Sequence, residues 1–136
     1  MITSGLEDYL ELIHNTLKKN KEIRAIDIAN KFNISRSSVS EALIRLAEDD
    51  FIIYEGRKGV KITQKGIEEA EKISRKHKTL FLFFTKILNI NNATADKNAC
   101  KIEHVIDDEI IKKLENFISY CSKNSLAENF TKENND

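Results

Sequence analysis

Apolar residues recur at three- and four-residue steps along much of the chain, which is the spacing of helices with one buried face. This pattern predicts a helix from about Gly5 to Lys19, capped by Ser4, and two shorter helices over Ile26–Phe32 and Arg36–Glu48. Asn33-Ile34-Ser35 would form the turn between the short helices, because Asn tolerates a left-handed backbone and Ser is a good N-cap. The apolar residues expected to face inward are Ile26, Ile28, Ala29, Phe32, Val39, Leu43, Ile44, Leu46 and Ala47.

Two short runs rich in β-branched and aromatic residues follow, and they predict strands over Phe51–Tyr54 and Val60–Thr63. A glycine-flanked hairpin tip joins them, so the whole segment is typical of a winged helix-turn-helix. The start of the second helix is polar and the tip is basic, which suits reading of the major groove together with phosphate contact. The candidate DNA-binding residues are Ser35, Arg36, Ser37, Ser38, Ser40, Arg57 and Lys58. A helix-turn-helix that contacts only other proteins is the alternative, and the basic tip argues against it.

The second half of the chain is expected to be helical throughout. Thr63 can cap a helix from about Gln64 to Leu88, and two more helices are predicted over Ala93–Val105 and Asp107–Lys123. The last of these should turn inward Ile110, Ile111, Leu114, Phe117 and Ile118. Residues 80–84 are apolar around the whole helix, so we expect a second copy of the chain to cover them; an internal core is the alternative.

The composition and charge of the chain indicate where the protein works and how it could bind DNA. The 136 residues carry 22 Lys and Arg against 22 Asp and Glu, so DNA binding would depend on a local basic patch. The sequence contains no apolar run long enough to span a membrane and no secretory signal, and its two cysteines are too few for a disulfide framework. These features predict a cytoplasmic protein that does not bind membranes.

Cys100, Glu103 and His104 are spaced so that all three lie on one face of a helix, where they could converge on one metal ion. The alternative is a packed cysteine with two solvated polar neighbours. Asp8 and Glu11 form a separate acidic pair, which on its own is typical of a helix N-terminus. His77, within an apolar face, is on its own typical of a core histidine.

Taken together around a winged helix-turn-helix, these residues resemble the diphtheria-toxin-repressor family of metal-dependent transcriptional regulators, which includes manganese transport regulators. The strings that carry the resemblance are Glu7-Asp8-Tyr9-Leu10, Ser37-Ser38-Val39-Ser40, Leu46-Ala47-Glu48-Asp49-Asp50-Phe51-Ile52, Thr63-Gln64-Lys65-Gly66, Arg75-Lys76-His77 and, most specific, Ala99 to Glu109. Similar proteins are dimers that need a divalent ion to bind operator DNA. The metal ligands implied by the resemblance are Asp8, Glu11, His77, Cys100, Glu103 and His104.

The resemblance implies a mostly α fold without the SH3-like domain of longer members. A winged helix-turn-helix DNA-binding domain would occupy residues 1–65, a helical dimerisation and metal-binding domain residues 66–123, and a flexible tail residues 124–136. The ion would bridge the two domains and fix the angle between the two DNA-reading heads. The implied function is repression of iron or manganese homeostasis genes, with double-stranded operator DNA and a second copy of the chain as partners, and with no small organic substrate.

The implied ligand set mixes two types of site. Asp8 and Glu11 match manganese-type members, whereas a cysteine at position 100 matches the iron type. Phe81 stands where a glutamate is common, and Asp96 stands near a position that is histidine in iron-type members. An ancillary site of the iron type would therefore be incomplete or rebuilt with Asp96. Because a thiolate favours Fe²⁺ over Mn²⁺, we rank Fe²⁺ first and Mn²⁺ second, with Co²⁺, Ni²⁺ or Zn²⁺ able to bind in vitro.

Two other functions are compatible with parts of the sequence. A winged-helix regulator could sense an oxidant through Cys100, or a small apolar ligand, without any metal. A metalloenzyme with Glu103 and His104 at a hydrolytic centre is the other; the sequence has no nucleophile motif and no HExxH helix to support it. The sequence therefore predicts a regulator and not an enzyme.

Overall fold

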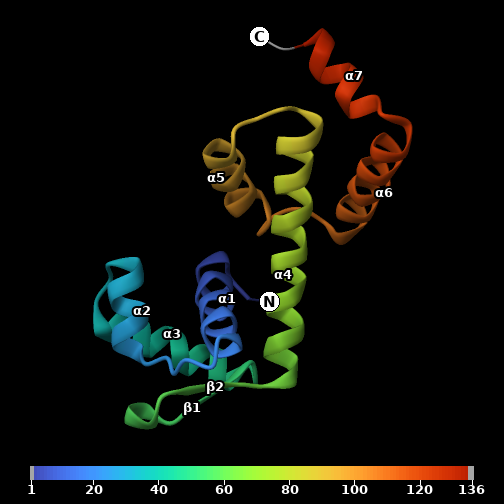
Figure 1. The fold of residues 1–136 in the computed structure, drawn as a ribbon. Helices are drawn as coiled ribbons and strands as arrows, with labels where there is room; N and C mark the ends of the chain where they lie inside the picture. Colours follow the sequence, from blue (N-terminus) through green and yellow to red (C-terminus); the bar gives the residue numbers. More distant parts are fainter. Residues whose placement is uncertain (1, 135–136) are drawn as a thin grey trace. The chain divides into compact units, whose positions relative to one another are not determined.

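The computed structural model describes residues 2–134, and the chain divides into two compact units: unit 1, Met1–Lys72, and unit 2, Ile73–Asp136. The elements of unit 1 are, in order, α1 (Ser4–Lys18), α2 (Ala25–Phe32), α3 (Arg36–Glu48), β1 (Ile52–Tyr54), a 3₁₀ turn (Gly56–Lys58), β2 (Val60–Ile62) and the first part of α4 (Gln64–Leu82). This is the predicted winged helix-turn-helix (Figure 1).

Local side-chain chemistry explains where these helices begin and end. Asn33 ends α2 in the left-handed conformation, with φ of 53°, and the hydroxyl of Ser35 accepts the backbone N–H of Ser38 at 3.2 Å. Both features were predicted from the sequence. The cap of α1 was not: the Thr3 hydroxyl accepts the N–H of Leu6 at 3.3 Å, and Ser4 is the first helical residue. Thr and Ser are both good caps, so the sequence alone did not distinguish them.

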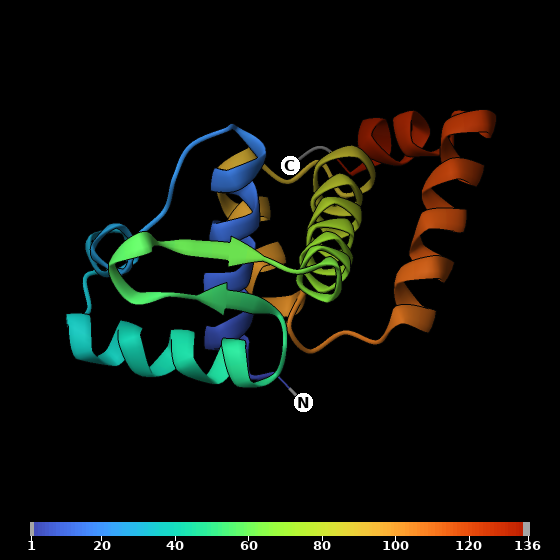
Figure 2. The same ribbon diagram turned by 90° about the horizontal axis from the view of Figure 1, so that it is seen from below.

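The core of unit 1 lies between the helices and the hairpin. Its largest fully buried side chains are Leu10, Ile13, Ile28, Val39, Leu43 and Leu46. The two strands pair antiparallel, with Ile53 opposite Lys61, and Figure 2 shows the hairpin lying across α1 and beside α3. Two residues predicted to face inward do not: Ile26 is 38% exposed and Ile44 is 48% exposed. Ala25, which is half-buried, packs against the core instead, and α2 begins at this residue, one earlier than predicted.

Unit 2 contains the rest of α4, a π-helical turn (Phe83–Ile87), α5 (Asn92–Ile102), α6 (Asp108–Asn124) and α7 (Leu126–Glu133). In Figure 1, α5 and α6 flank this part of α4 on opposite sides. Its small core consists of Leu80, Ala99 and Ile111, with half-buried apolar residues around them. Within residues 2–134, no helix has the length and apolar character needed to cross a membrane.

The helix predicted from about Gln64 to Leu88 has that extent, but its hydrogen bonding becomes π-helical after Leu82, and the N–H of Leu88 binds the carbonyl of Phe83 at 3.2 Å. Two other expectations for unit 2 were wrong. Ile110 and Phe117 were expected to face inward but are 49% and 46% exposed. The segment after Asn124, expected to lack structure, forms α7; residues 135 and 136 lie outside the described part.

Candidate metal centre and DNA-binding face

A groove of about 360 Å³ in unit 1 brings together the start of α2, the start of α3 and the hairpin tip. Three arginines line it: Arg24 before α2, Arg36 at the start of α3 and Arg57 in the tip. Ser40 and Tyr54 also line it. Guanidinium groups bind phosphate oxygens in a bidentate manner, so this groove can hold a phosphate of a nucleic-acid backbone.

The predicted serines have different roles. The Ser35 hydroxyl caps α3 and lies 2.8 Å from the Ser38 hydroxyl and 3.2 Å from that of Ser37, so these three form one cluster at the start of α3. Only Ser40 of the predicted serines lines the arginine groove. Lys58 is exposed on the tip beside Arg57. The predicted DNA-binding residues thus all lie at the start of α3 or on the hairpin tip.

Arg24 belongs to the cations that lead into the motif, but it is not among the DNA-binding residues predicted from the sequence. Its backbone N–H binds the Asp27 carboxylate at 2.9 Å, which fixes the start of α2, while its guanidinium lies 3.8 Å from Glu22. The signal that could have found it is its place directly before the first helix of the motif, where the helix N-terminus favours anions.

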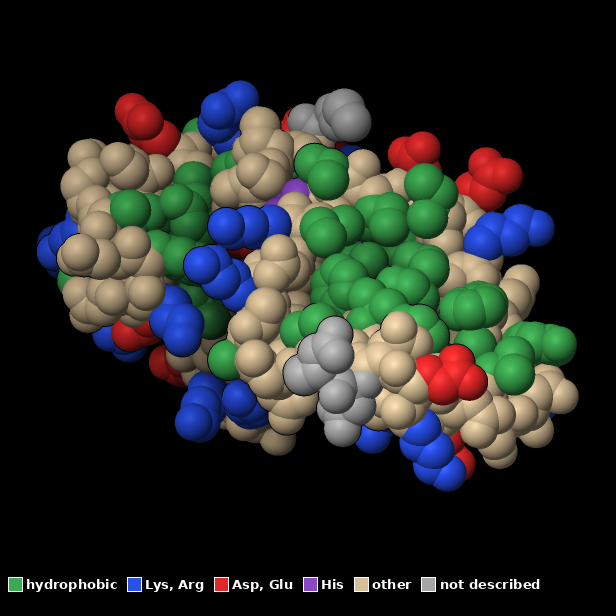
Figure 3. All heavy atoms as spheres, turned by 90° about the horizontal axis from the view of Figure 1, so that it is seen from above, with side chains coloured by type: hydrophobic (Ala, Val, Ile, Leu, Met, Phe, Trp, Pro, Cys, Tyr) green, Lys and Arg blue, Asp and Glu red, His purple; other side chains and the backbone are tan. Residues whose placement is uncertain are grey.

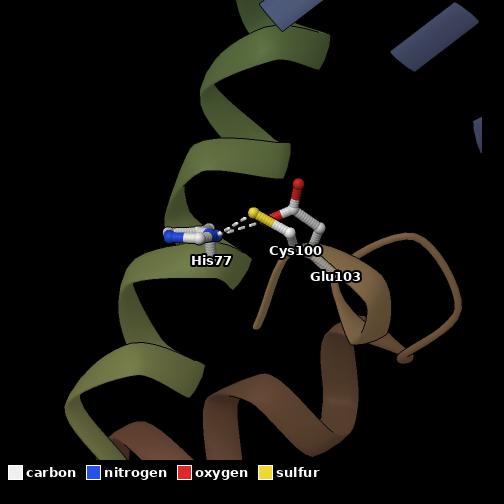
Figure 4. A group of neighbouring side chains, drawn as sticks. All are labelled: His77, Cys100 and Glu103. Carbon is white, nitrogen blue, oxygen red and sulfur yellow. Dashed lines mark hydrogen bonds and ion pairs between the residues drawn. The ribbon is translucent and has the colours of Figure 1, made fainter. Parts of the chain in front are cut away.

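The second cluster lies in unit 2, where α4 and α5 bring three different donor atoms together. His77 Nδ1 on α4 lies 2.8 Å from a carboxylate oxygen of Glu103 and 3.7 Å from the sulfur of Cys100 (Figure 4). One ligand atom from each of the three residues falls within 4.8 Å of the others. Ligand atoms that surround one ion at about 2.0–2.3 Å lie a few ångströms from one another. The spacing of these three donor atoms therefore fits a divalent metal ion.

Glu103 lies at the centre of this group. It follows the last residue of α5 and is only 2% exposed. One of its carboxylate oxygens faces His77, and the other lies 3.6 Å from Nε2 of His104. The helix ends at Ile102, so His104 lies in the turn after α5 instead of on the helical face that its spacing predicted. His104 therefore lies beside the Glu103 oxygen that does not face His77.

The contact with Glu103 raises the pKa of His77 above its ordinary value, because the carboxylate hydrogen-bonds to the charged imidazole; Asp96 adds to the effect and burial opposes it. Protons therefore compete with a metal ion for Nδ1, and the competition extends above the usual pH range of a histidine. We expect metal affinity to fall as the pH falls through the pKa of His77.

The residues before His77 hold α4 against the rest of unit 2. Arg75 makes a two-point contact with Glu115 on α6, at 2.6 and 3.3 Å. The ammonium group of Lys76 donates to the carbonyl of Ile106 at 2.7 Å and lies 3.2 Å from Asp108. The string Arg75-Lys76-His77 thus contacts α6, the loop after α5, and α5 itself.

The other two implied ligands belong to unit 1. Asp8 and Glu11 lie one turn apart on α1, and both are half-buried. A half-buried carboxylate pair is unusual for a merely solvated helix end, and carboxylate oxygens suit Mn²⁺ and Fe²⁺.

Comparison with known protein families and structures agrees with this arrangement. The family description "Iron dependent repressor, N-terminal DNA binding domain" matches residues 1–60, and "Iron dependent repressor, metal binding and dimerisation domain" matches residues 63–127. An uncharacterized HTH-type transcriptional regulator of Methanocaldococcus jannaschii is 38% identical over 118 residues, which cover 86% of this chain and 94% of that protein. The HTH-type transcriptional regulator MntR of Shouchella clausii is 29% identical over 124 residues, covering 91% of this chain and 86% of that protein.

Among solved structures, that of the manganese regulator SloR superimposes with a TM-score of 0.75 at 29% identity. The match covers 85% of this chain but 54% of SloR, so the chain spans about half the length of that protein. The relatives are transcriptional regulators and not enzymes. This chain belongs to the family of metal-dependent, iron-dependent-repressor-type transcriptional regulators, with a DNA-binding domain followed by a metal-binding and dimerisation domain.

Proposed function

We propose that the protein is a cytoplasmic repressor of iron or manganese homeostasis genes, with a divalent metal ion as its co-repressor. The observation that carries the proposal is the nitrogen, sulfur and oxygen group of His77, Cys100 and Glu103. His104 beside Glu103, and Asp8 and Glu11 from α1, are the remaining proposed ligands. The bound ion would supply positive charge that neutralises the clustered carboxylates.

The chemistry of the donors supports Fe²⁺ as the physiological ion, with Mn²⁺ second. Carboxylate oxygens suit both ions, but the Cys100 sulfur adds a softer ligand that favours Fe²⁺. The relatives named for manganese do not decide the matter for this chain, because position 100 here is a cysteine. Zn²⁺ and Co²⁺ would also bind in vitro, since divalent affinities generally follow the order of the first-row metals.

The proposed partners are operator DNA and a second copy of the chain. Most of the exposed large apolar side chains lie in unit 2: Leu88, Ile90, Val105, Ile110, Phe117, Tyr120, Leu126 and Phe130. Figure 3 shows hydrophobic side chains gathered in a broad patch on one face of the molecule. Patches of this kind mark interaction surfaces, and a dimerisation domain is the family's description of residues 63–127.

A direct test measures DNA binding with and without metal. A binding site is first selected from a random DNA library with Fe²⁺-loaded protein, and fluorescence anisotropy then follows binding by metal-free protein under anaerobic conditions. We expect tight binding after addition of Fe²⁺ or Mn²⁺, reversed by a chelator. Asp8→Ala should weaken metal-activated binding and leave the dimer intact, while Cys121→Ser, which changes the other cysteine, should leave activation unchanged.

Equal binding with chelator and with metal would contradict the proposal. The metal-free alternative, sensing of an oxidant through Cys100, would then be supported if peroxide changed DNA binding of the wild type but not of Cys100→Ser.

A further inference from the structure

The imidazole of His77 makes polar contacts on both edges. Nδ1 faces Glu103 and Cys100, while Nε2 lies 3.0 Å from a carboxylate oxygen of Asp96. Asp96 and Cys100 are four residues apart on α5, so one face of that helix supplies a contact to each edge of the ring. The ring of Phe81 lies nearly parallel to that of His77, with an interplanar angle of 12° and centroids 6.4 Å apart.

A histidine that binds a metal through one ring nitrogen carries its proton on the other. That N–H needs an acceptor, and a carboxylate in this position fixes the tautomer and the ring orientation and makes the ligand nitrogen more basic. We propose that Asp96 is a positioning residue of the metal group: its carboxylate accepts the Nε2–H of His77 and directs Nδ1 toward Cys100 and Glu103. This inference rests on the proposed function, because it takes His77 as a ligand through Nδ1.

Asp96 could instead be a ligand of a second ion bound at Nε2. The contacts do not favour this role, because Nε2 and the Asp96 carboxylate are only two donors and Phe81, stacked beside the ring, adds none. Among residues 2–134, the donor groups of three that could hold an ion include His77 with Cys100 and Glu103, and none includes Asp96.

The expected effect of Asp96 is moderate. Loss of an outer-shell partner of a metal-binding histidine typically lowers metal affinity about 10–100-fold. The side chain of Asp96 is 63% exposed, so water can replace part of the lost hydrogen bond. We therefore expect a loss near the lower end of that range, about tenfold.

Titration of metal-free protein with Co²⁺, followed by the thiolate-to-cobalt absorption of Cys100, tests the role of Asp96. Asp96→Ala should lower Co²⁺ affinity about tenfold without changing the number of ions bound. Asp96→Asn keeps an oxygen acceptor and should recover part of the affinity. Glu115→Ala is the matched control, because it removes the carboxylate that binds Arg75 on α4 outside the metal group and should leave the affinity unchanged.

Proton NMR of the Co²⁺-loaded protein reports the contact itself. The exchangeable Nε2–H of His77, shifted by the cobalt, should be visible in the wild type and in Glu115→Ala. In Asp96→Ala it should broaden through exchange with water. A structural role of Asp96 in holding α5 would not by itself produce this selective change.

Three results would contradict the inference in different ways. Unchanged affinity and an unchanged Nε2–H signal in Asp96→Ala would remove the positioning role, and loss of one bound Co²⁺ would make Asp96 a ligand. Absence of Co²⁺ binding in the wild type would overturn the proposed function itself. Nitrogen NMR of His77 in metal-free protein would then decide the contact alone: it is supported if the Nε2 signal changes in Asp96→Ala but not in Glu115→Ala, and overturned if it changes in neither.

Discussion

Single side chains decide which ion the proposed metal group would select. Cys100 supplies the only sulfur among the proposed ligands, and its neighbours in the group, His77 and Glu103, supply nitrogen and oxygen. Without this sulfur, the proposed ligands would offer only nitrogen and oxygen atoms to the ion. The identity of residue 100 should set the order of metals more than that of any other ligand.

Cys100→Glu should therefore shift metal activation toward Mn²⁺. An added carboxylate favours hard ions, while loss of the thiolate weakens binding of Fe²⁺, Co²⁺ and Zn²⁺ relative to Mn²⁺. We expect the ratio of Mn²⁺ to Co²⁺ affinity, measured by isothermal titration calorimetry, to rise at least tenfold. An unchanged ratio would mean that the sulfur does not bind the ion; Cys121→Ser serves as the control.

Gly66 is a second residue with a specific physical role. It lies in the first turn of α4, where its N–H binds the Thr63 hydroxyl at 3.0 Å, and a Cβ there would overlap the carbonyl oxygen of Phe51. Glycine is thus needed for close approach between the start of α4 and the residue before β1.

Gly66→Ala should destabilise the protein by about 3 kcal/mol, the upper end of typical overpacking, because the contact is with backbone that cannot move aside. Gly5→Ala is the matched control: a Cβ at Gly5 meets no atom within 4 Å, so it should stabilise α1 by about 0.5 kcal/mol. Thermal unfolding followed by circular dichroism measures both. Equal midpoints for the two variants would show that the backbone at Gly66 relaxes freely.

At the scale of elements, the arginine groove explains why three separate segments meet where they do. The start of α2, the start of α3 and the hairpin tip each place one arginine in it. A phosphate bound there would contact all three segments at once, so DNA binding should depend on each.

Arg24→Ala and Arg57→Ala should each weaken binding to specific and random DNA alike, because phosphate contacts carry no sequence information. Each lost phosphate contact should reduce the slope of log affinity against log salt concentration by about 0.9. Lys113→Ala, a charge change at an exposed position of α6 in unit 2, is the control. A salt slope that stays at the wild-type value would exclude contact of these arginines with phosphate.

The elements that could be predicted from the sequence are those whose ends are set by residues adjacent in the chain. The turn at Asn33 and Ser35 depends on residues adjacent in the sequence, and α3 was predicted with its observed ends. The π-helical turn and the end of α5 were not predictable, because Phe83–Ile87 and Ile102 carry no glycine or proline and their hydrogen bonding follows from packing.

The metal group, too, could be predicted from the sequence only in part. The spacing of Cys100, Glu103 and His104 indicated that they could act together. The contact of Cys100 and Glu103 with His77, 23 residues earlier than Cys100, entered only through the family resemblance. The contact of Asp96 with the far edge of His77 depends on how α4 and α5 pack, and the sequence singled out Asp96 only through its place near a histidine position of iron-type members.

At the scale of the whole molecule, the exposed apolar surface of unit 2 bears on the oligomeric state. Phe117 and Tyr120 on α6 are 46% and 57% exposed, although both are large and apolar or aromatic. Burial of such residues by a second chain would supply much of the free energy of dimerisation.

Phe117→Glu should convert the protein to a monomer and weaken operator binding, because a charge would be buried in the interface. Ile53→Glu is the matched control, since Ile53 is 47% exposed on β1 of unit 1 and should leave the dimer intact. Sedimentation velocity at several concentrations measures the dimer. A Phe117→Glu protein that still sediments as a dimer would place the interface elsewhere.

The unequal exposure of the metal group has a consequence for kinetics. Cys100 is exposed, whereas Glu103 is almost completely buried. An ion that arrives from solution would meet the sulfur first and the carboxylate second, and a departing ion would leave in the reverse order. The thiolate would then control the rates of metal capture and release, and with them the delay between a fall in cellular metal and the renewed transcription of the repressed genes.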